Sequence, residues 1–300
     1  MTTQPPAGPP PAAAQPPAPQ PIPGQPIPGR PPAPEPGRRM SPGLAIFLFV
    51  GIPLIVLALI ITGSIAAVNA FRGTPLTENV DAEAGSSLFI DVPNAAIRLT
   101  PSDDDQIHVT MRGTYSGTRP PLDVTASGDE TEVRGGCPDG WFLFFNNCRV
   151  RIEVSLPPGL DVTAEGQNGS ISADDLTGFL DLSTTNGAIE VDGSSGELVL
   201  HTTNGRIELD DATSADVQAQ TTNGAVHLSF SDAPDTVQAN STNGEIRVIV
   251  PDDGTEYFVD ANTTNGRIDT EDVPGDRRSD RTITAETTNG AVTIETSRRH

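Results

Sequence analysis

Seven Asn-Gly corners after residue 160, each leading into an apolar run, constrain the fold of this chain more than any other feature. Five read Thr-Thr-Asn-Gly, one reads Ser-Thr-Asn-Gly and the first reads Gln-Asn-Gly. Self-similarity at a period of about 20 residues is typical of repeat proteins. The corners consist of Asn168, Asn186, Asn204, Asn223, Asn243, Asn265 and Asn289, followed by Gly169, Gly187, Gly205, Gly224, Gly244, Gly266 and Gly290.

The spacing around these corners is fixed on one side only. The first apolar residues before and after each corner are nine residues apart, from Val162 and Ile171 to Ile283 and Val292. The return from one repeat to the next grows from nine residues to fifteen. Insertions are therefore confined to one edge of the array, as repeat proteins allow. The variable loops lie at 211–216, 231–236, 250–257 and 270–281.

Apolar and polar residues alternate within each run, as in Ile189-Glu190-Val191. A period of two indicates half-buried strands, so the fold class is all-β. One architecture is an antiparallel meander with type I′ Asn-Gly hairpins. We favour a β-solenoid, because stacked coils place Asn over Asn and Thr over Thr in side-chain ladders. In this interpretation the corner glycine supplies a left-handed conformation.

Composition divides the remaining sequence into segments. The first is rich in proline and lacks the apolar residues of a core, which predicts a disordered segment. The expected organisation is a cytoplasmic Pro-rich segment at 1–42, a transmembrane helix at 43–70, a linker at 71–86, a capping β region at 87–155, the solenoid at 156–296 and a tail at 297–300.

The apolar segment from Leu44 to Val68 has 25 residues and no charge. As a helix it would extend roughly 37 Å, enough for a bilayer core of about 30 Å. Three arginines precede it and Arg72 follows it, so the positive-inside rule places the N-terminus in the cytoplasm and the repeats outside. A cleaved signal peptide is the alternative, because 68–70 resembles a cleavage site. The long charged lead-in favours an uncleaved, single-pass plasma-membrane anchor.

The charge balance is strongly acidic. The chain has 18 Lys plus Arg, all of them Arg, against 40 Asp plus Glu, for a formal net charge of −22. Such a surface is not expected to bind nucleic acid. The acidity instead favours solubility and discourages association between strand edges.

Cys137 and Cys148 are the only cysteines. Both fall on the predicted outer side of the membrane, so we expect them to form a disulfide. Between them is a consecutive apolar run, whose members cannot all face one side of a strand. The run either plugs the open end of the solenoid or forms an exposed patch that contacts a partner or the membrane. The candidate partner contacts are Trp141, Phe142, Phe144 and Phe145.

The sequence contains no phosphate-binding loop, zinc motif or Gly-x-Ser-x-Gly elbow. We therefore predict no enzyme activity, no catalytic residues, no cofactor and no metal. The acid pairs Asp210-Asp211 and Asp252-Asp253 leave a carbohydrate-active solenoid enzyme as an alternative. With the acids at 103–105 and 174–175 they also offer oxygen ligands for calcium. None of these segments fits an EF-hand or the calcium-binding nonapeptide repeat, which favours solvated turn acids.

The segment Arg151-Ile-Glu-Val-Ser-Leu-Pro-Pro-Gly-Leu-Asp-Val-Thr-Ala-Glu-Gly-Gln-Asn-Gly-Ser-Ile171 precedes the recurrent Thr-Thr-Asn-Gly corners. Over residues 86–296 the chain resembles the bacterial "putative adhesin" β-strand-repeat family. The resemblance implies a β-helical domain at the cell envelope, in some members associated with envelope stress, and no catalytic residues. The Pro-rich head, the absence of Lys and the Arg content resemble membrane-anchored proteins of actinobacteria.

The leading functional hypothesis is a non-enzymatic, adhesin-like binding or scaffold module displayed outside the membrane. Its partner would be an envelope protein or a glycan, contacted through the variable loops and the aromatic run. A rigid array holds weak contacts at fixed spacing, so that they add through effective concentration. One alternative is an envelope-stress sensor or regulator that signals through its membrane anchor, and the other is the carbohydrate-active enzyme.

Overall fold

The computed structural model describes residues 41, 43, 46–71, 73–138 and 148–297. The chain divides into two compact units, residues 1–59 and residues 60–300. A π-helical turn, η1 (Phe47–Gly51), precedes the helix α2 (Ile52–Phe71). Among the described residues, no helix is both long and apolar enough to cross a bilayer. The predicted membrane span at 43–70 therefore stays a prediction.

After the end of α2, the second unit consists of two β-sheets. Sheet A contains, in spatial order, β1 (Thr74–Glu83), β4 (Gln106–Tyr115), β7 (Cys148–Leu156), β3 (Ala96–Pro101), β9 (Ile171–Asp174), β11 (Ile189–Asp192), β13 (Ile207–Ala212), β15 (Val226–Phe230), β17 (Ile246–Val250), β21 (Val292–Thr296) and β19 (Ile268–Asp269). Sheet B contains β18 (Phe258–Asn265), β20 (Thr282–Asn289), β16 (Thr236–Asn243), β14 (Asp216–Asn223), β12 (Leu198–Thr202), β10 (Leu180–Thr184), β8 (Asp161–Gly166), β2 (Ser87–Val92), β6 (Glu130–Gly135) and β5 (Leu122–Ser127).

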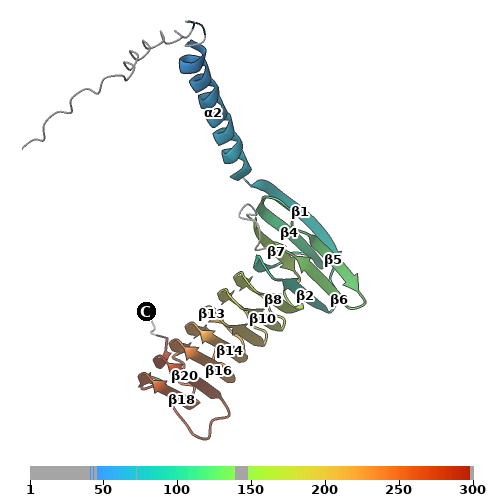
Figure 1. Cartoon of the computed structure of the whole chain (residues 1–300). Coiled ribbons are helices and arrows are strands. Elements are labelled where there is room, and N and C mark those ends of the chain that lie inside the picture. Colours follow the sequence, from blue (N-terminus) through green and yellow to red (C-terminus); the bar gives the residue numbers. More distant parts are fainter. Residues whose placement is uncertain (1–40, 42, 44–45, 72, 139–147, 298–300) are drawn as a thin grey trace, which may run out of the picture. The chain divides into compact units, whose positions relative to one another are not determined.

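The strands on the two sides of each Asn-Gly corner lie in different sheets. Strand β10 pairs in parallel with β12, with Leu180 opposite Leu198, and β11 pairs in parallel with β13, with Ile189 opposite Ile207. An antiparallel meander would pair β10 with β11, so that alternative is wrong. The parallel sheets are those of a β-solenoid, in which one strand of each sheet forms a coil (Figure 1).

The inward side chains of both sheets form one continuous hydrophobic core. In all but one of the pairs spaced nine residues apart, both members are at most 3% exposed. The exception is the coil β18/β19, where Val259 is half-buried and Ile268 is 44% exposed. This coil lies at the end of the stack and has a neighbour on one side only. The difference in burial therefore follows from position, because the residue types match the other coils.

The coils do not stack in chain order at either end. At the C-terminal end the chain passes from β16/β17 to β18/β19, and β20/β21 then inserts between these two coils. At the N-terminal end β2/β3 lies between β6/β7 and β8/β9. The sequence does not predict either exchange, because each coil has the same inward pattern and could accept either neighbour.

The N-terminal end of the stack is closed by antiparallel strands. Strand β4 pairs antiparallel with both β1 and β7, and β5 pairs antiparallel with β6. Residues 74–83, expected to belong to a polar linker, instead form β1. Leu76 is the buried residue of this strand and belongs to the core, and the strand pairs with β4 along its whole length. Polar composition concealed the strand, since one face of an edge strand is solvated.

Candidate binding face

The corner asparagines form a continuous ladder on the surface of the solenoid. Each side-chain amide donates a hydrogen bond to the side-chain oxygen of the asparagine in the adjacent coil, at 2.7–2.9 Å. The ladder starts at Asn94, whose amide group donates to the carbonyl of Cys137. From there it runs through Asn168, Asn186, Asn204, Asn223, Asn243, Asn289 and Asn265.

The first hydroxyl residue of each corner points inward and is held by the backbone. Thr202, for example, is fully buried and donates to the carbonyl of Gly187 at 3.0 Å. The expected stack of hydroxyls bonded to one another is therefore wrong, since the hydroxyl acceptor is a corner carbonyl of the adjacent coil. The residues with this bond are Thr184, Thr202, Thr221, Ser241, Thr263 and Thr287.

The corner glycines have a different role from the one predicted. None of them has a positive φ; the described glycines that do lie elsewhere, at Gly193 and Gly254 for example. A Cβ atom at Gly205 would instead lie closer than 3.0 Å to the carbonyl oxygen of Gly187 in the adjacent coil. The prediction of a left-handed corner is thus corrected. Glycine is required because the backbones of stacked corners approach too closely for any side chain.

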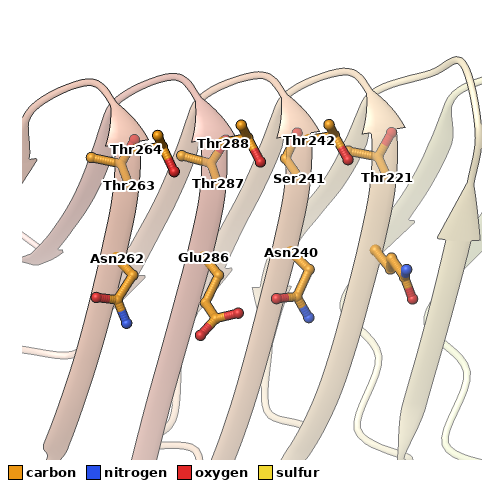
Figure 2. Close-up of a pocket in the computed structure, with 11 residues that line it drawn as sticks. Thr221, Asn240, Ser241, Thr242, Asn262, Thr263, Thr264, Glu286, Thr287 and Thr288 are labelled. Atoms are coloured by element: carbon orange, nitrogen blue, oxygen red, sulfur yellow. The ribbon is translucent and has the colours of Figure 1, made fainter.

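Next to the corners, the outer face of sheet B carries a polar groove of about 450 Å³. Figure 2 shows its side chains in rows that cross four neighbouring strands. One row contains the residues just before the corner motifs, and in stack order these are Gln220, Asn240, Glu286 and Asn262. A second row contains the second threonines, Thr242, Thr288 and Thr264. The first hydroxyl residues of these corners also line the groove and are Thr221, Ser241, Thr287 and Thr263. The strand register sets a spacing of about 4.8 Å between members of a row.

The groove offers hydrogen bonds with little formal charge. Its lining consists of amides, hydroxyls and a single carboxylate, that of Glu286. Amides both donate and accept, and hydroxyls do the same. The groove is open and is lined by the faces of strands, so it suits an extended polar partner better than an enclosed small molecule. In the sequence, this row corresponds to the position before the first hydroxyl residue of each corner, which is always polar although its identity varies.

The outer face of sheet A is acidic over β9, β11 and β13, in coils nearer the N-terminal end than the groove. Asp174, Asp192 and Asp210 stand opposite one another in register, beside Glu190 and Glu208. Burial, followed by repulsion from neighbouring carboxylates, raises the pKa of Asp210 above its usual value. In the part of the chain that the structure describes, no group of three or more His, Cys, Asp or Glu residues could hold a metal ion.

The predicted acid pairs have separate local roles. Asp211 adopts a positive φ of 50° and accepts a hydrogen bond from Ser231 at 3.3 Å. Asp253 accepts a hydrogen bond from the backbone N–H of Thr255 at 2.9 Å, and hydrogen bonding by Thr255 lowers the pKa of Asp253. For Asp211 and Asp253 these are the contacts of turn residues.

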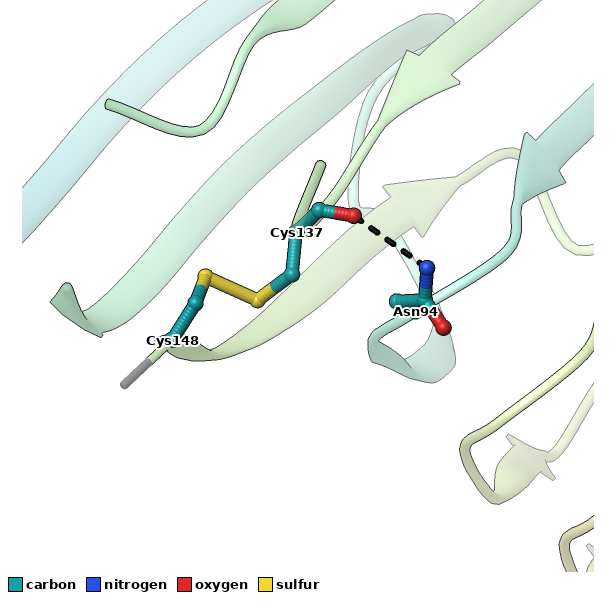
Figure 3. The surroundings of a disulfide bond; sticks show 3 residues. All are labelled: Asn94, Cys137 and Cys148. Atoms are coloured by element: carbon teal, nitrogen blue, oxygen red, sulfur yellow. Dashed lines mark hydrogen bonds between the residues drawn. A yellow bond between two sulfur atoms is a disulfide. The ribbon is translucent and has the colours of Figure 1, made fainter. Parts of the chain in front are cut away.

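The predicted disulfide between Cys137 and Cys148 is confirmed. Figure 3 shows it beside Asn94, so the covalent bond and the start of the asparagine ladder share one site. Cys148 opens β7 and stands opposite Tyr115 of β4. The candidate contact residues Trp141, Phe142, Phe144 and Phe145 lie outside the described residues.

Residues 161–300 match the family model Toastrack DUF4097. No curated protein matches the chain in sequence. Among solved structures, a "putative cell adhesion protein" from Clostridium sporogenes ATCC 15579 is 14% identical, with a TM-score of 0.39 and coverage of 75% of this chain and 100% of that one.

Two further structures show a comparable level of similarity. A "putative adhesin" from Bacteroides fragilis NCTC 9343 is 14% identical, with a TM-score of 0.37 and coverage of 75% of this chain and 99% of that one. A "putative adhesin" from Parabacteroides merdae ATCC 43184 is 12% identical, with a TM-score of 0.35 and coverage of 75% and 97%. In sequence, residues 161–300 of this chain are thus similar to the Toastrack DUF4097 family.

Proposed function

We propose that this chain is a non-enzymatic, adhesin-like binding module of the cell envelope and that the polar groove on sheet B contacts a glycan. The observation that supports this most directly is the row of Gln220, Asn240, Glu286 and Asn262 on adjacent strands. The row presents amide and carboxylate groups at the constant spacing of the coils. A glycan repeats hydroxyl and amide groups along its length, so several of its units can bond to one row at once.

The rigidity of the row makes weak contacts useful. Each hydrogen bond contributes only about 1 kcal/mol in water. Contacts held at fixed spacing add within one complex, because the second and third form at high effective concentration. The buried threonine hydroxyls and the asparagine ladder hold the backbone on one side of the groove, which keeps the row in place without a bound partner.

We further propose display outside the plasma membrane through the apolar segment 43–70, with residues 1–42 in the cytoplasm. Leu54, Leu57 and Leu59 of α2 are all more than half exposed. Exposed apolar side chains at this density are unfavourable in water and call for a lipid or protein environment. The arginines before the segment support the orientation.

The glycan proposal can be tested by co-sedimentation of the detergent-solubilised full chain with purified peptidoglycan sacculi. The test variant is Asn240→Ala/Glu286→Ala/Asn262→Ala, which removes three members of the row. The matched control is Ser172→Ala/Glu190→Ala/Glu208→Ala on the outer face of sheet A. If each hydrogen bond contributes about 1 kcal/mol, the test variant should bind roughly 100-fold more weakly.

The control should bind sacculi as well as the unchanged chain. Circular dichroism must show that both variants keep the β-sheet signal. Equal loss of binding in the two variants would contradict a specific role for the groove, and so would failure of the unchanged chain to sediment with sacculi.

A further inference from the structure

Three arginines gather on the outer face of sheet A, at the end of the solenoid where β1 begins. They are Arg112 of β4 and Arg149 and Arg151 of β7. All three side chains are exposed. They surround a shallow groove of about 560 Å³, whose other lining residues are Ala96, Gly113, Thr114, Val150 and Glu153.

The charge at this groove is opposite to that of the chain. Three guanidinium groups and one carboxylate, Glu153, give a formal charge of +2 (3 − 1), whereas the whole chain has −22. Arg112 and Arg151 are directly opposite one another on antiparallel strands. Like charges in that position repel and destabilise the pair. The repulsion between these two arginines is unfavourable for folding, and an anionic ligand bound beside them would reduce it.

Few carboxylates neutralise the cluster from nearby. Arg112 lies 3.6 Å from a carboxylate oxygen of Glu153, a long ion pair between exposed groups. Neither Arg149 nor Arg151 has an ion pair with any residue that the structure describes. In a chain with more than twice as many acidic as basic residues, two exposed arginines with no ion pair among the described residues indicate a surface arranged for an external anion.

The chain leaves α2 directly beside this groove. A Cβ atom at Gly73 would lie 3.1 Å from Cβ of Thr114, which lines the groove. Pro75 stands opposite Thr114, and Thr114 stands opposite Arg149. Helix α2 ends at Phe71, two residues before Gly73, and two extended residues reach at most about 7 Å. The groove is therefore close to the end of the helix.

We propose that this groove binds the anionic phospholipid head groups of the bilayer that holds the chain. The proposal rests on the membrane display proposed above. The head-group region extends several Å beyond the hydrocarbon core, so a groove next to the end of a spanning helix lies within reach of it. Clustered arginines beside a membrane helix are attracted to anionic lipid surfaces. Docking would restrain the solenoid at its base.

The test uses the full chain inserted into lipid nanodiscs. One set contains phosphatidylcholine alone and the other contains phosphatidylcholine with phosphatidylglycerol. Phenylglyoxal labels accessible arginines, and peptide mass spectrometry reads each site. Labelling of Arg149 and Arg151 should fall about fivefold in the anionic discs, the factor that corresponds to one arginine at an anionic surface. Arg206, half exposed on a distant coil, is the internal reference and should not change.

Two variants sharpen the result, with Arg112 as the reporter. In Arg149→Gln/Arg151→Gln the anionic discs should no longer protect Arg112. In the control Arg277→Gln/Arg278→Gln, within the loop 270–281, protection should remain. Circular dichroism checks that both variants are folded. High salt should also remove protection, because the screening length falls to about 3 Å at 1 M.

The outcomes separate this proposal from the one it rests on. If the chain does not co-purify with nanodiscs, membrane display itself is contradicted. If it co-purifies and Arg149 is labelled equally in both lipid compositions, display stands and the docking proposal is overturned. Equal protection of the detergent-solubilised chain by soluble glycerol phosphate would assign the groove to a free anion and would also overturn docking to the bilayer.

Discussion

The two ends of the solenoid differ in how their last coil is covered. At the N-terminal end, β4 and β5 pair antiparallel with the outer coil β6/β7, and β1 pairs with β4 beyond it. A disulfide joins Cys137 and Cys148 across the segment between β6 and β7. At the C-terminal end, β18/β19 has no further strand beyond it among the described residues. Phe258 is 39% exposed there and Ile268 is 44% exposed.

The comparison shows what a regular repeat can and cannot supply. A coil buries its inward side chains only against its neighbours, so the last coil of any stack needs a cap. Irregular sequence provides the cap at the N-terminal end. At the C-terminal end the loop before β20 contributes part of one, because Val273 is buried and Tyr257 forms a bridge with Gly275. We therefore expect local stability to be lower at the C-terminal end.

The largest expected effect comes from removing the disulfide at the N-terminal end of the solenoid. Replacing Cys137 and Cys148 by Ser removes a cross-link with a sequence separation of 11 residues. For a loop of this size the free energy of unfolding should fall by about 3 kcal/mol. Chemical denaturation of the variant and of the unchanged chain would measure the loss. Reducing the unchanged chain should reproduce it, and equal stability in all three would show that the antiparallel strands close this end unaided.

A smaller but sharp effect is expected inside the regular stack. Gly205→Ala places a methyl group against the carbonyl of Gly187, and the coils can only move apart. Overpacking of this kind costs about 1–3 kcal/mol. Gly275→Ala is the matched control, because the nearest atom to its Cβ would be 3.9 Å away. If both variants unfold at the same denaturant concentration, close stacking is not the reason for the corner glycine.

Each hydroxyl of the buried row should contribute less to the free energy of unfolding than a corner glycine does. Thr202→Val keeps the shape of the side chain but leaves the carbonyl of Gly187 without its 3.0 Å hydrogen bond. The cost should be about 1–3 kcal/mol, toward the lower limit because only one acceptor loses its partner. Thr222→Val, at an exposed position of the next coil, should be close to neutral. Equal midpoints in denaturant for the two would contradict a structural role of the inward hydroxyl.

The smallest effect depends on pH and belongs to the N-terminal end. Hydrogen bonds to Asp81 and then to Asp104 raise the pKa of His108 above its usual 6.5. A raised folded pKa means that this stabilisation is complete below pH 6.5 and is lost as pH rises through the folded value. His108→Gln should lower the melting temperature slightly at pH 5.5 and leave it unchanged at pH 9. The same decrease at both pH values would contradict this assignment.

How far the sequence predicts this fold depends on whether a contact repeats. The nine-residue spacing around Asn186 and Asn204 is local and recurrent, so it predicts the two strands of each coil and their parallel stacking. The order of the coils is not local, because Val259 and Ile283 have equivalent inward positions and either could pair with the coil of Val237. The connection at 270–281 is long enough to permit either order, so the sequence does not decide between them.

The polar groove on sheet B was not predicted from the sequence for a related reason. Before each corner threonine stands a polar residue, but its identity varies from His201 to Gln220 to Asn240. A search for identical residues finds the corner and passes over the row beside it. The arginine groove could not be predicted without the antiparallel register of β4 and β7, because Arg112 and Arg151 are far apart in sequence.

Amide hydrogen exchange of the full chain tests the arrangement of the stack most directly. Strand β18 has one partner, β20, whereas β20 lies between β16 and β18. Amides of 258–265 should therefore exchange faster than those of 282–289, although 282–289 is nearer the C-terminus. Faster hydrogen exchange in 282–289 would mean that the coils stack in chain order. That result would contradict the insertion of β20/β21 between β16/β17 and β18/β19, and with it the exposed position of β18/β19 at the end of the stack.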